Sequence, residues 1–131
     1  MVDEGIEPEF MGIVNYSVLA LIQLQLDENA PLELDAQVIE SLYDKTVAEV
    51  KALMLKKNHD YGEAWRNMRV SSFTDIILMR LLRIRQIEDN QGKTVASEGV
   101  DSNYMDMMNY AIFALIKLDE KSSSPNLKNP N

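Results

Sequence analysis

The chain has 131 residues, of which 46% are hydrophobic and 26% are charged, so it is long enough to bury a core of its own. The absence of cysteine excludes disulfides, thiolate zinc sites and cysteine nucleophiles, and it fits a reducing cytoplasm. A net charge of −8 argues against a general nucleic-acid-binding protein, because neutralising a phosphate backbone requires a surplus of lysine and arginine. No apolar run reaches the roughly 18–20 residues of a membrane span, and the acidic first residues lack the basic region of a signal peptide. We therefore expect a cytoplasmic protein that binds neither a membrane nor a nucleic-acid polymer.

The spacing of apolar residues predicts helices in the first half of the chain. A first helix is expected over Glu7–Leu26, because Pro8 suits a first turn and apolar residues follow at helical spacing. A second helix is expected over Asp35–Asn58, with Asp35 as its N-cap and Gly62 ending the helical segment. The positions expected to be buried in these two helices are Phe10, Ile13, Val14, Leu21, Leu24, Val38, Leu42, Val47, Val50 and Leu53.

The second half of the chain predicts two further helices. Residues 59–70 are expected to form an irregular connection, after which Ser71 or Ser72 caps a third helix over Phe73–Asp89. Asp101 is placed to cap a fourth helix over Ser102–Asp119, and residues 122–131 are too polar to pack, which predicts a disordered tail. Because no segment alternates as a strand does, we expect an all-α four-helix bundle.

The first and fourth predicted helices are copies of one sequence pattern. Residues 4–24 and 98–118 align without gaps at an offset of 94, and nine of the 21 aligned residues are identical. We interpret residues 1–27 as the last helix of a preceding copy, 28–34 as a linker and 35–121 as a complete copy, which is consistent with a fragment of a tandem protein. The repeat predicts that the two helices pack side by side about an approximate two-fold axis, and that the chain forms a homo-oligomer through them.

The fourth helix carries a candidate site around Asp106. On a helix, Asn103 and Asn109 lie three residues from Asp106 and Tyr110 lies four residues away, so a carboxylate, two amides and a phenol share one ridge. Mg²⁺ prefers such hard oxygen ligands when the phosphates of a substrate complete its coordination shell. The alternative is that Asp106 lies at a solvent-facing edge of the helix.

The segment after the second helix offers the complementary groups. Lys57 could hold a phosphate, Asp60 could bind a metal, and Tyr61 and Trp65 provide flat surfaces on which a base could stack. The alternatives are that the lysine satisfies the helix dipole and that the aromatic residues close one end of the bundle. His59 is interpreted as a surface residue.

Basic residues are concentrated in the middle of the chain. Eight of the thirteen lysines and arginines lie between Lys51 and Arg85, a density that suits a small phosphorylated ligand. Arg80 and Arg83 share a face of the third helix, and guanidinium groups bind phosphate oxygens in a fixed plane. Ion pairing with acidic residues is the alternative reading.

These motifs together resemble the nucleotide-modification-associated domain family. The resemblance covers about residues 36–118, with elements at 57–62 (Lys-Asn-His-Asp-Tyr-Gly), 83–85 (Arg-Ile-Arg), 98–99 (Glu-Gly) and 109–110 (Asn-Tyr). The family is similar to the all-α MazG-like nucleotide pyrophosphohydrolases. The resemblance therefore implies a magnesium-dependent hydrolase that splits a nucleoside triphosphate into monophosphate and pyrophosphate.

The acidic motifs depart from the MazG-like pattern. The second helix has Glu49 but Ala52 three residues later, and the fourth has Asn103 where an acid is expected three residues before Asp106. Two hypotheses remain: a hydrolase, or a catalytically silent module that binds a nucleotide or a partner. In the hydrolase, the catalytic residues are Asp106 and Glu49; the magnesium ligands are Glu49, Asp60, Glu98 and Asp106; and the substrate is bound by Lys57, Asp60, Tyr61, Trp65, Arg80, Arg83 and Asn109.

Overall fold

The computed structural model describes residues 6–26, 33–90 and 99–123, except for the side chains of Asp60, Tyr61 and Ser123. These residues form the α-helices α1 (Ile6–Gln25), α2 (Ala36–Tyr61), α3 (Val70–Asp89) and α4 (Val100–Ser123), and the short 3-10 helix η2 (Ala64–Asn67). The described part of the chain contains no strand, which confirms the all-α expectation. No helix within it is both long and apolar enough to cross a membrane.

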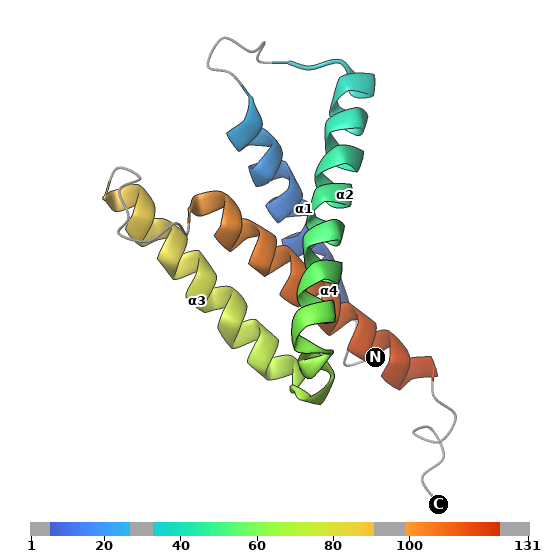
Figure 1. The fold of residues 1–131 in the computed structure, drawn as a ribbon. Coiled ribbons are helices and arrows are strands. Elements are labelled where there is room, and N and C mark those ends of the chain that lie inside the picture. The colour runs from blue at the N-terminus through green and yellow to red at the C-terminus, as the bar shows by residue number, and fades with distance from the viewer. Residues whose placement is uncertain (1–5, 27–32, 91–98, 124–131) are drawn as a thin grey trace, which may run out of the picture.

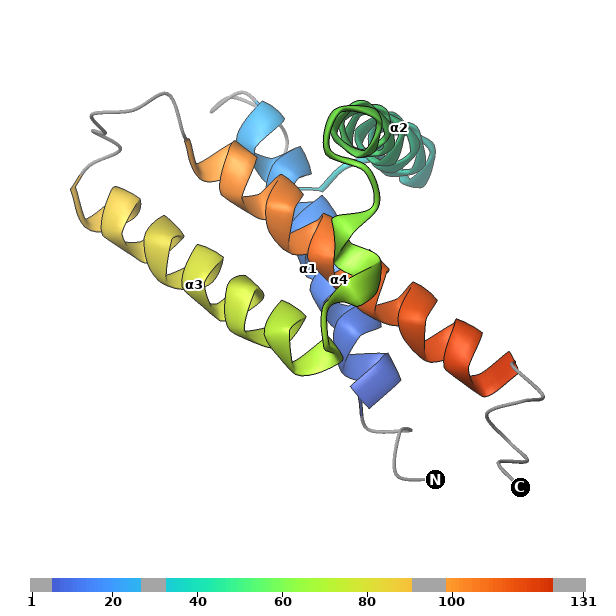
Figure 2. The ribbon, with the colours of Figure 1, turned by 60° about the horizontal axis from the view of Figure 1, so that its bottom comes forward.

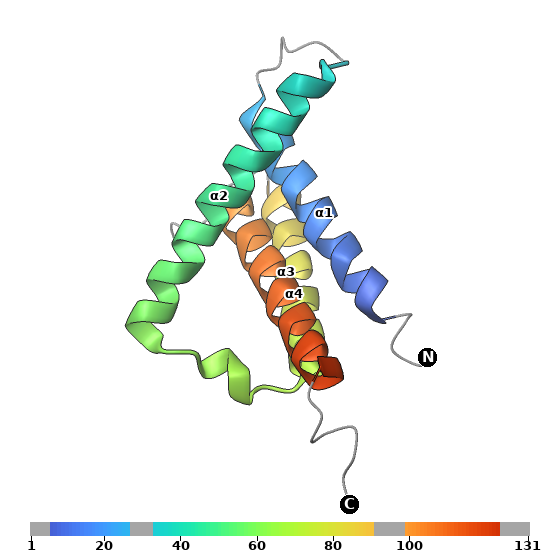
Figure 3. The same ribbon diagram turned by 90° about the vertical axis from the view of Figure 1, so that its right-hand side faces the viewer.

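Helix α4 lies between α1 and α3 and packs closely against both (Figure 1). Helix α2 crosses α4 on the side away from α3 (Figure 2). It packs more extensively on α1 than on α4. Helices α1 and α2 lie close together near the C-terminal end of α1 and diverge toward the other end of α1 (Figure 3). Helices α2 and α4 contact each other over a short stretch, and a cavity lies between them.

The core is centred on α4. Its apolar residues meet one face of α3 and one face of α1, and this continuous burial is what holds the three helices together. The core residues that these helices contribute are Phe10, Val18, Leu21, Ile22, Phe73, Ile77, Ile84, Tyr104, Met107, Met108, Ala111, Phe113, Ala114 and Leu118.

The predicted packing of the first helix against the fourth is confirmed. The rings of Tyr16 on α1 and Tyr104 on α4 lie 6.2 Å apart between centroids. Burial and the neighbouring hydroxyl of Tyr16 raise the pKa of Tyr104 to about 12, since both disfavour the phenolate. Two hydrogen bonds then fasten α2 to α1: Tyr43 Oη donates to Asn15 Oδ1 at 2.9 Å, and Gln25 Nε2 donates to Thr46 Oγ1 at 3.2 Å.

Several predicted helix boundaries need correction. Asp35 caps α2 as expected, accepting from the backbone N–H of Gln37 at 3.3 Å, but α2 continues to Tyr61. Helix α3 starts at Val70, so Ser71 and Ser72 lie in its first turn rather than at its cap. Asp101 likewise lies inside the first turn of α4, where its charge still favours the helix dipole. Helix α4 extends to Ser123, past the start of the predicted tail; residues 124–131 lie outside the described residues.

Two residues expected in the core are at the surface. Val38 is 45% exposed because α2 packs through its middle, at Thr46 and Val50, and leaves its first turns uncovered. Leu24 is 52% exposed because it lies in the last turn of α1, where it lines an open cavity together with Leu21.

Candidate functional site

Three helices bring charged groups together at Asp106. One carboxylate oxygen lies 3.4 Å from Lys57 Nζ of α2, and the other lies 3.4 Å from Arg80 Nε of α3. The side chain of Asp106 is only 21% exposed, so it does not point into bulk solvent. Two cations surround one anion, which leaves a local excess of one positive charge in a protein that is acidic overall.

Asp106 lines a cavity of about 190 Å³ between the end of α2, η2 and α4, which we call the Trp65 cavity. Most of its wall is apolar, and its polar groups come from both helices. The lining residues are Met54, Lys57, Asn58, Gly62, Ala64, Trp65, Met68, Asp106, Asn109, Tyr110 and Phe113.

Two buried polar atoms of the residues lining this cavity lack a hydrogen-bond partner. They are Trp65 Nε1, a donor, and Asn109 Oδ1, an acceptor, in residues that are 7% and 5% exposed. An unsatisfied buried donor or acceptor costs about 1–3 kcal/mol, so most native proteins pair nearly all of them. A ligand that supplies an acceptor and a donor to these atoms would recover that cost.

Phe113 and Arg66 pack against the faces of the Trp65 ring. The ring stacks on Phe113 at 4.5 Å between centroids with an interplanar angle of 5°, and the guanidinium of Arg66 lies 4.5 Å from its ring centroid. These neighbours occupy the positions where a base would stack, so we infer that Trp65 offers its edge, with Nε1, rather than a free face.

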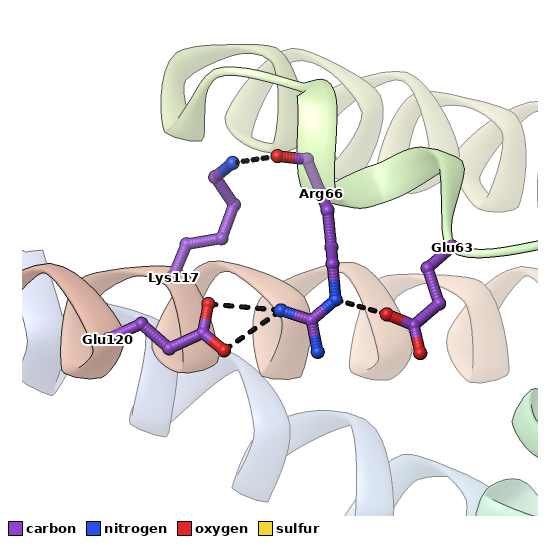
Figure 4. A network of polar contacts seen from close by, with 4 residues as sticks. All are labelled: Glu63, Arg66, Lys117 and Glu120. Atoms are coloured by element: carbon purple, nitrogen blue, oxygen red, sulfur yellow. Dashed lines mark hydrogen bonds and ion pairs between the residues drawn. The ribbon is translucent and has the colours of Figure 1, made fainter.

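A polar network fixes η2 to α4 beside the cavity (Figure 4). Arg66 pairs with Glu63, and its Nη1 donates to both carboxylate oxygens of Glu120 on α4 at 2.8 and 3.1 Å. The hydrogen bonds to Glu63 and Glu120 raise the pKa of Arg66 above its ordinary value. Lys117 Nζ also donates to the backbone carbonyl of Arg66 at 2.6 Å. The network therefore fixes the backbone on either side of Trp65.

Other predicted site residues lie elsewhere. Glu49 lines a separate cavity of about 380 Å³ that includes Gln25 and Asp101, so it is not a neighbour of Asp106. Glu49 lies eight residues before Lys57 on α2, which is about 12 Å along the helix axis, so the two side chains reach different cavities. Arg83 Nη1 donates to Gln86 of its own helix at 3.4 Å rather than lining the Trp65 cavity.

Three predicted residues cannot be placed in the site. Glu98 and the side chains of Asp60 and Tyr61 lie outside the described residues. His59 is exposed, as expected. Among the side chains that the structure describes, no group of three or more acids and histidines is close enough to hold a metal ion, so those residues alone do not fit the expected magnesium site.

The prediction missed the apolar wall and the network around Arg66. Met54, Met68 and Phe113 appear in the sequence as ordinary core positions, and nothing in their spacing distinguishes a cavity wall from a filled core. The pairing of Arg66 with Glu120 joins residues 54 positions apart, which helical spacing alone does not reveal.

The fold and the site define an all-α protein with a ligand-sized, partly charged cavity between crossing helices. A comparison with protein families matches the chain to nucleotide modification associated domain 1 over residues 1–24 and 57–118. The chain therefore belongs to this family, and the matched segments contain α1 up to Leu24 and every residue of the Trp65 cavity except Met54. No curated protein and no solved structure gives a significant match.

Proposed function

We propose that the chain binds a nucleotide, with its base in the Trp65 cavity and its phosphate at Lys57 and Arg80. The observation that carries this proposal is the pair of unsatisfied buried atoms, Trp65 Nε1 and Asn109 Oδ1, in residues that line one cavity. The edge of a nucleobase presents adjacent acceptors and donors, so it complements such a pair. Membership of a nucleotide-related family supports the same class of ligand.

The size of the cavity favours a single planar ring. An engineered cavity of about 150 Å³ lined by aliphatic and aromatic side chains admits benzene, and the Trp65 cavity measures about 190 Å³. Met54, Met68 and Phe113 supply apolar contacts for the ring. The cavity therefore has room for the ring of a pyrimidine.

The charges favour a phosphate near Asp106. Lys57 and Arg80 share one carboxylate, and Arg80 Nε makes no hydrogen bond even though it lies 3.4 Å from Asp106. Lys57 Nζ carries three donors and gives one to Asp106, so it retains capacity for an anion, and Arg80 adds a second positive charge beside Asp106. A phosphate forms charge-assisted hydrogen bonds with such groups, which are about twice as strong as neutral ones.

The proposal is tested by titrating the protein with pyrimidine nucleoside monophosphates and with the matching nucleosides. Trp65 is the only tryptophan, so its fluorescence reports on the cavity directly. We expect saturable binding, and we expect Lys57→Met to weaken nucleotide binding by about tenfold while leaving nucleoside binding unchanged.

Lys56→Met is the matched control, since Lys56 is adjacent and exposed but does not line the cavity. It should bind as the wild type does. Equal losses of nucleotide affinity in the two variants would show that only the net charge of the protein matters and would reject the site at Lys57. The absence of any saturable change in fluorescence or heat would reject the proposal as a whole.

Magnesium-dependent hydrolysis of a nucleoside triphosphate is the second candidate. The position of Asp106 favours it, because a carboxylate only 21% exposed beside a cavity is suited to bind a cation that a substrate brings.

Pyrophosphate release from a panel of deoxynucleoside triphosphates with magnesium separates the two candidates. Hydrolysis requires release by the wild type and its loss in Asp106→Asn. Binding alone predicts no release, and several-fold tighter binding of a monophosphate by Asp106→Asn, because this variant removes the anion that competes for Lys57 and Arg80.

A further inference from the structure

An exposed stripe runs along α1, which forms an outer edge of the molecule (Figure 3). Its members follow one another at steps of three and four residues, and such steps keep side chains on one face of a helix. We call this set the α1 stripe; it consists of the five exposed residues Glu9, Gly12, Tyr16, Leu19 and Gln23. The ring of Tyr16 packs against Tyr104, but more than half of its surface and of the surface of Leu19 stays exposed.

The α1 stripe has the properties of a helix-packing surface. Apolar side chains that are exposed together mark sites of association, because their burial removes apolar area from water. The alternation of three and four residues is also the spacing by which two helices pack along their lengths. A Cβ atom added at Gly12 meets no atom within 4 Å, so there is open space at this position. The stripe is therefore suited to pack against a second helix.

A second copy of α1 fits the stripe because the stripe is complementary to itself. Tyr16 lies at its centre, with Glu9 and Gln23 seven residues to either side. Gly12 lies four residues before the centre and Leu19 three residues after it. In an antiparallel pair with a two-fold axis at Tyr16, Leu19 packs over the partner's Gly12, and Gln23 lies beside the partner's Glu9. A large side chain then meets a small residue, and an amide donor meets a carboxylate.

Charge selects the antiparallel orientation. The charged residues of α1 are Glu7 and Glu9 in its first turn, and the helix contains no lysine or arginine. A parallel pair places Glu9 beside the partner's Glu9, with no cation of α1 to offset the repulsion. The antiparallel pair separates these two carboxylates by twice seven residues, which is about 21 Å along the axis at 1.5 Å per residue. Since physiological salt screens charges over about 8 Å, little repulsion remains.

We propose that the chain forms a two-fold symmetric dimer in which the α1 stripes of two copies pack against each other in antiparallel orientation. The dimer is independent of the proposed function, because no residue of α1 lines the Trp65 cavity. Each copy in the dimer therefore keeps its own cavity.

Cross-linking through introduced cysteines tests the pairing. The chain contains no cysteine, so each introduced thiol is the only one in its copy. With a short bismaleimide linker, Tyr16→Cys should cross-link to itself, because the two-fold axis brings the two copies of this position together. Gln23→Cys alone should stay monomeric on a denaturing gel, whereas an equal mixture of Gln23→Cys and Glu9→Cys should give the mixed dimer. Leu55→Cys, at an exposed position of α2, is the control and should not cross-link.

The pattern of cross-links decides between the arrangements. Gln23→Cys that links to itself would show a parallel pair and overturn the inference. Tyr16→Cys that links no more than Leu55→Cys, or a mixture that gives no mixed dimer, would place the contact elsewhere and overturn it as well.

The charge of residue 23 provides a second test, by sedimentation equilibrium. Gln23→Lys places a cation beside the partner's Glu9 in two symmetric contacts, so the dissociation constant of the dimer should fall severalfold. Gln23→Glu places two carboxylates together in each contact, so this constant should rise severalfold. Equal constants for the two variants, or a wild type that sediments as a monomer at every concentration, overturn the inference.

Discussion

Asn15 and Asn109 occupy equivalent positions 94 residues apart, but only Asn15 has a partner for its amide oxygen. Asn15 Oδ1 accepts from the hydroxyl of Tyr43 on α2, whereas Asn109 Oδ1 is buried without a partner. In both cases the asparagine lies beside α2. We propose that the ligand donates a hydrogen bond to Asn109 Oδ1, as the hydroxyl of Tyr43 donates one to Asn15 Oδ1.

The first prediction follows from this contrast. Asn109→Leu replaces an unpaired buried acceptor with an apolar group of similar size, so the melting temperature should stay constant or rise. Nucleotide affinity should fall by about tenfold or more, because the base loses its acceptor.

Asn15→Leu is the matched control. It should lose about 1 kcal/mol of stability, since it breaks the hydrogen bond to Tyr43, and it should bind the nucleotide normally. A melting temperature several degrees lower for Asn109→Leu would instead show that Asn109 supports the fold.

At this scale the sequence predicts the chemistry of the site better than its geometry. The charges and amides of Asp106, Lys57, Arg80 and Asn109 predict a site for a nucleotide and its metal. The structure brings the first three into contact, and Asn109 lines the cavity that Asp106 and Lys57 also line. The resemblance to MazG-like enzymes adds Glu49, which lines a different cavity. Residue type does not reveal where along their lengths two helices cross, and that position decides which cavity a side chain lines.

At the scale of the elements, Gly62 shapes the turn that joins α2 to η2. Its φ of 70° and ψ of −165° lie in a region that only glycine occupies readily. Gly62→Ala should therefore destabilise the protein by about 1–3 kcal/mol in chemical denaturation, although the added methyl group meets no atom within 4 Å.

Gly12→Ala separates backbone strain from the mere addition of a methyl group. Gly12 lies within α1, and a methyl group there also meets no atom within 4 Å. This variant should gain about 0.5–1 kcal/mol, because alanine loses less conformational entropy than glycine in a helix. Equal effects of the two substitutions would contradict the account of the turn.

The elements themselves are largely predictable from the sequence, but only some of their ends are. Asp35 and Gly62 mark the ends of α2 through their own conformational preferences, so the sequence identifies them. The start of α3 at Val70 is not marked by a capping residue, because the side chain of Arg69 makes no capping hydrogen bond. Sequence preferences alone therefore do not locate this boundary. The helix η2 is likewise positioned by the contacts of Arg66 and Trp65 with α4.

On the scale of the whole molecule, α3 covers one side of α4, whereas the corresponding side of its sequence copy α1 is largely exposed. Tyr110 and Phe113 of α4 pack against Phe73 of α3. Their counterparts Tyr16 and Leu19 on α1 are 58% and 54% exposed. The repeat therefore suggests that α1 offers a face to which another copy of the chain can add a helix.

We expect self-association through this face of α1, rather than through both α1 and α4, because α4 is already covered. Light scattering after size exclusion should show a species larger than the monomer, and Leu19→Lys should convert it to a monomer. Leu55→Lys, at a position of α2 that is 53% exposed, should assemble as the wild type does. A wild-type monomer at micromolar concentration would refute the prediction.

The central claim is that a nucleotide base meets the edge of Trp65 between α2 and α4. The most direct test follows the single indole N–H signal of the protein by nuclear magnetic resonance while thymidine monophosphate is added. We expect this signal to shift and saturate together with the amide signals of Lys57 and Asn109, because Nε1 gains an acceptor. An indole signal that stays in place while other signals saturate would put the ligand elsewhere and contradict the account.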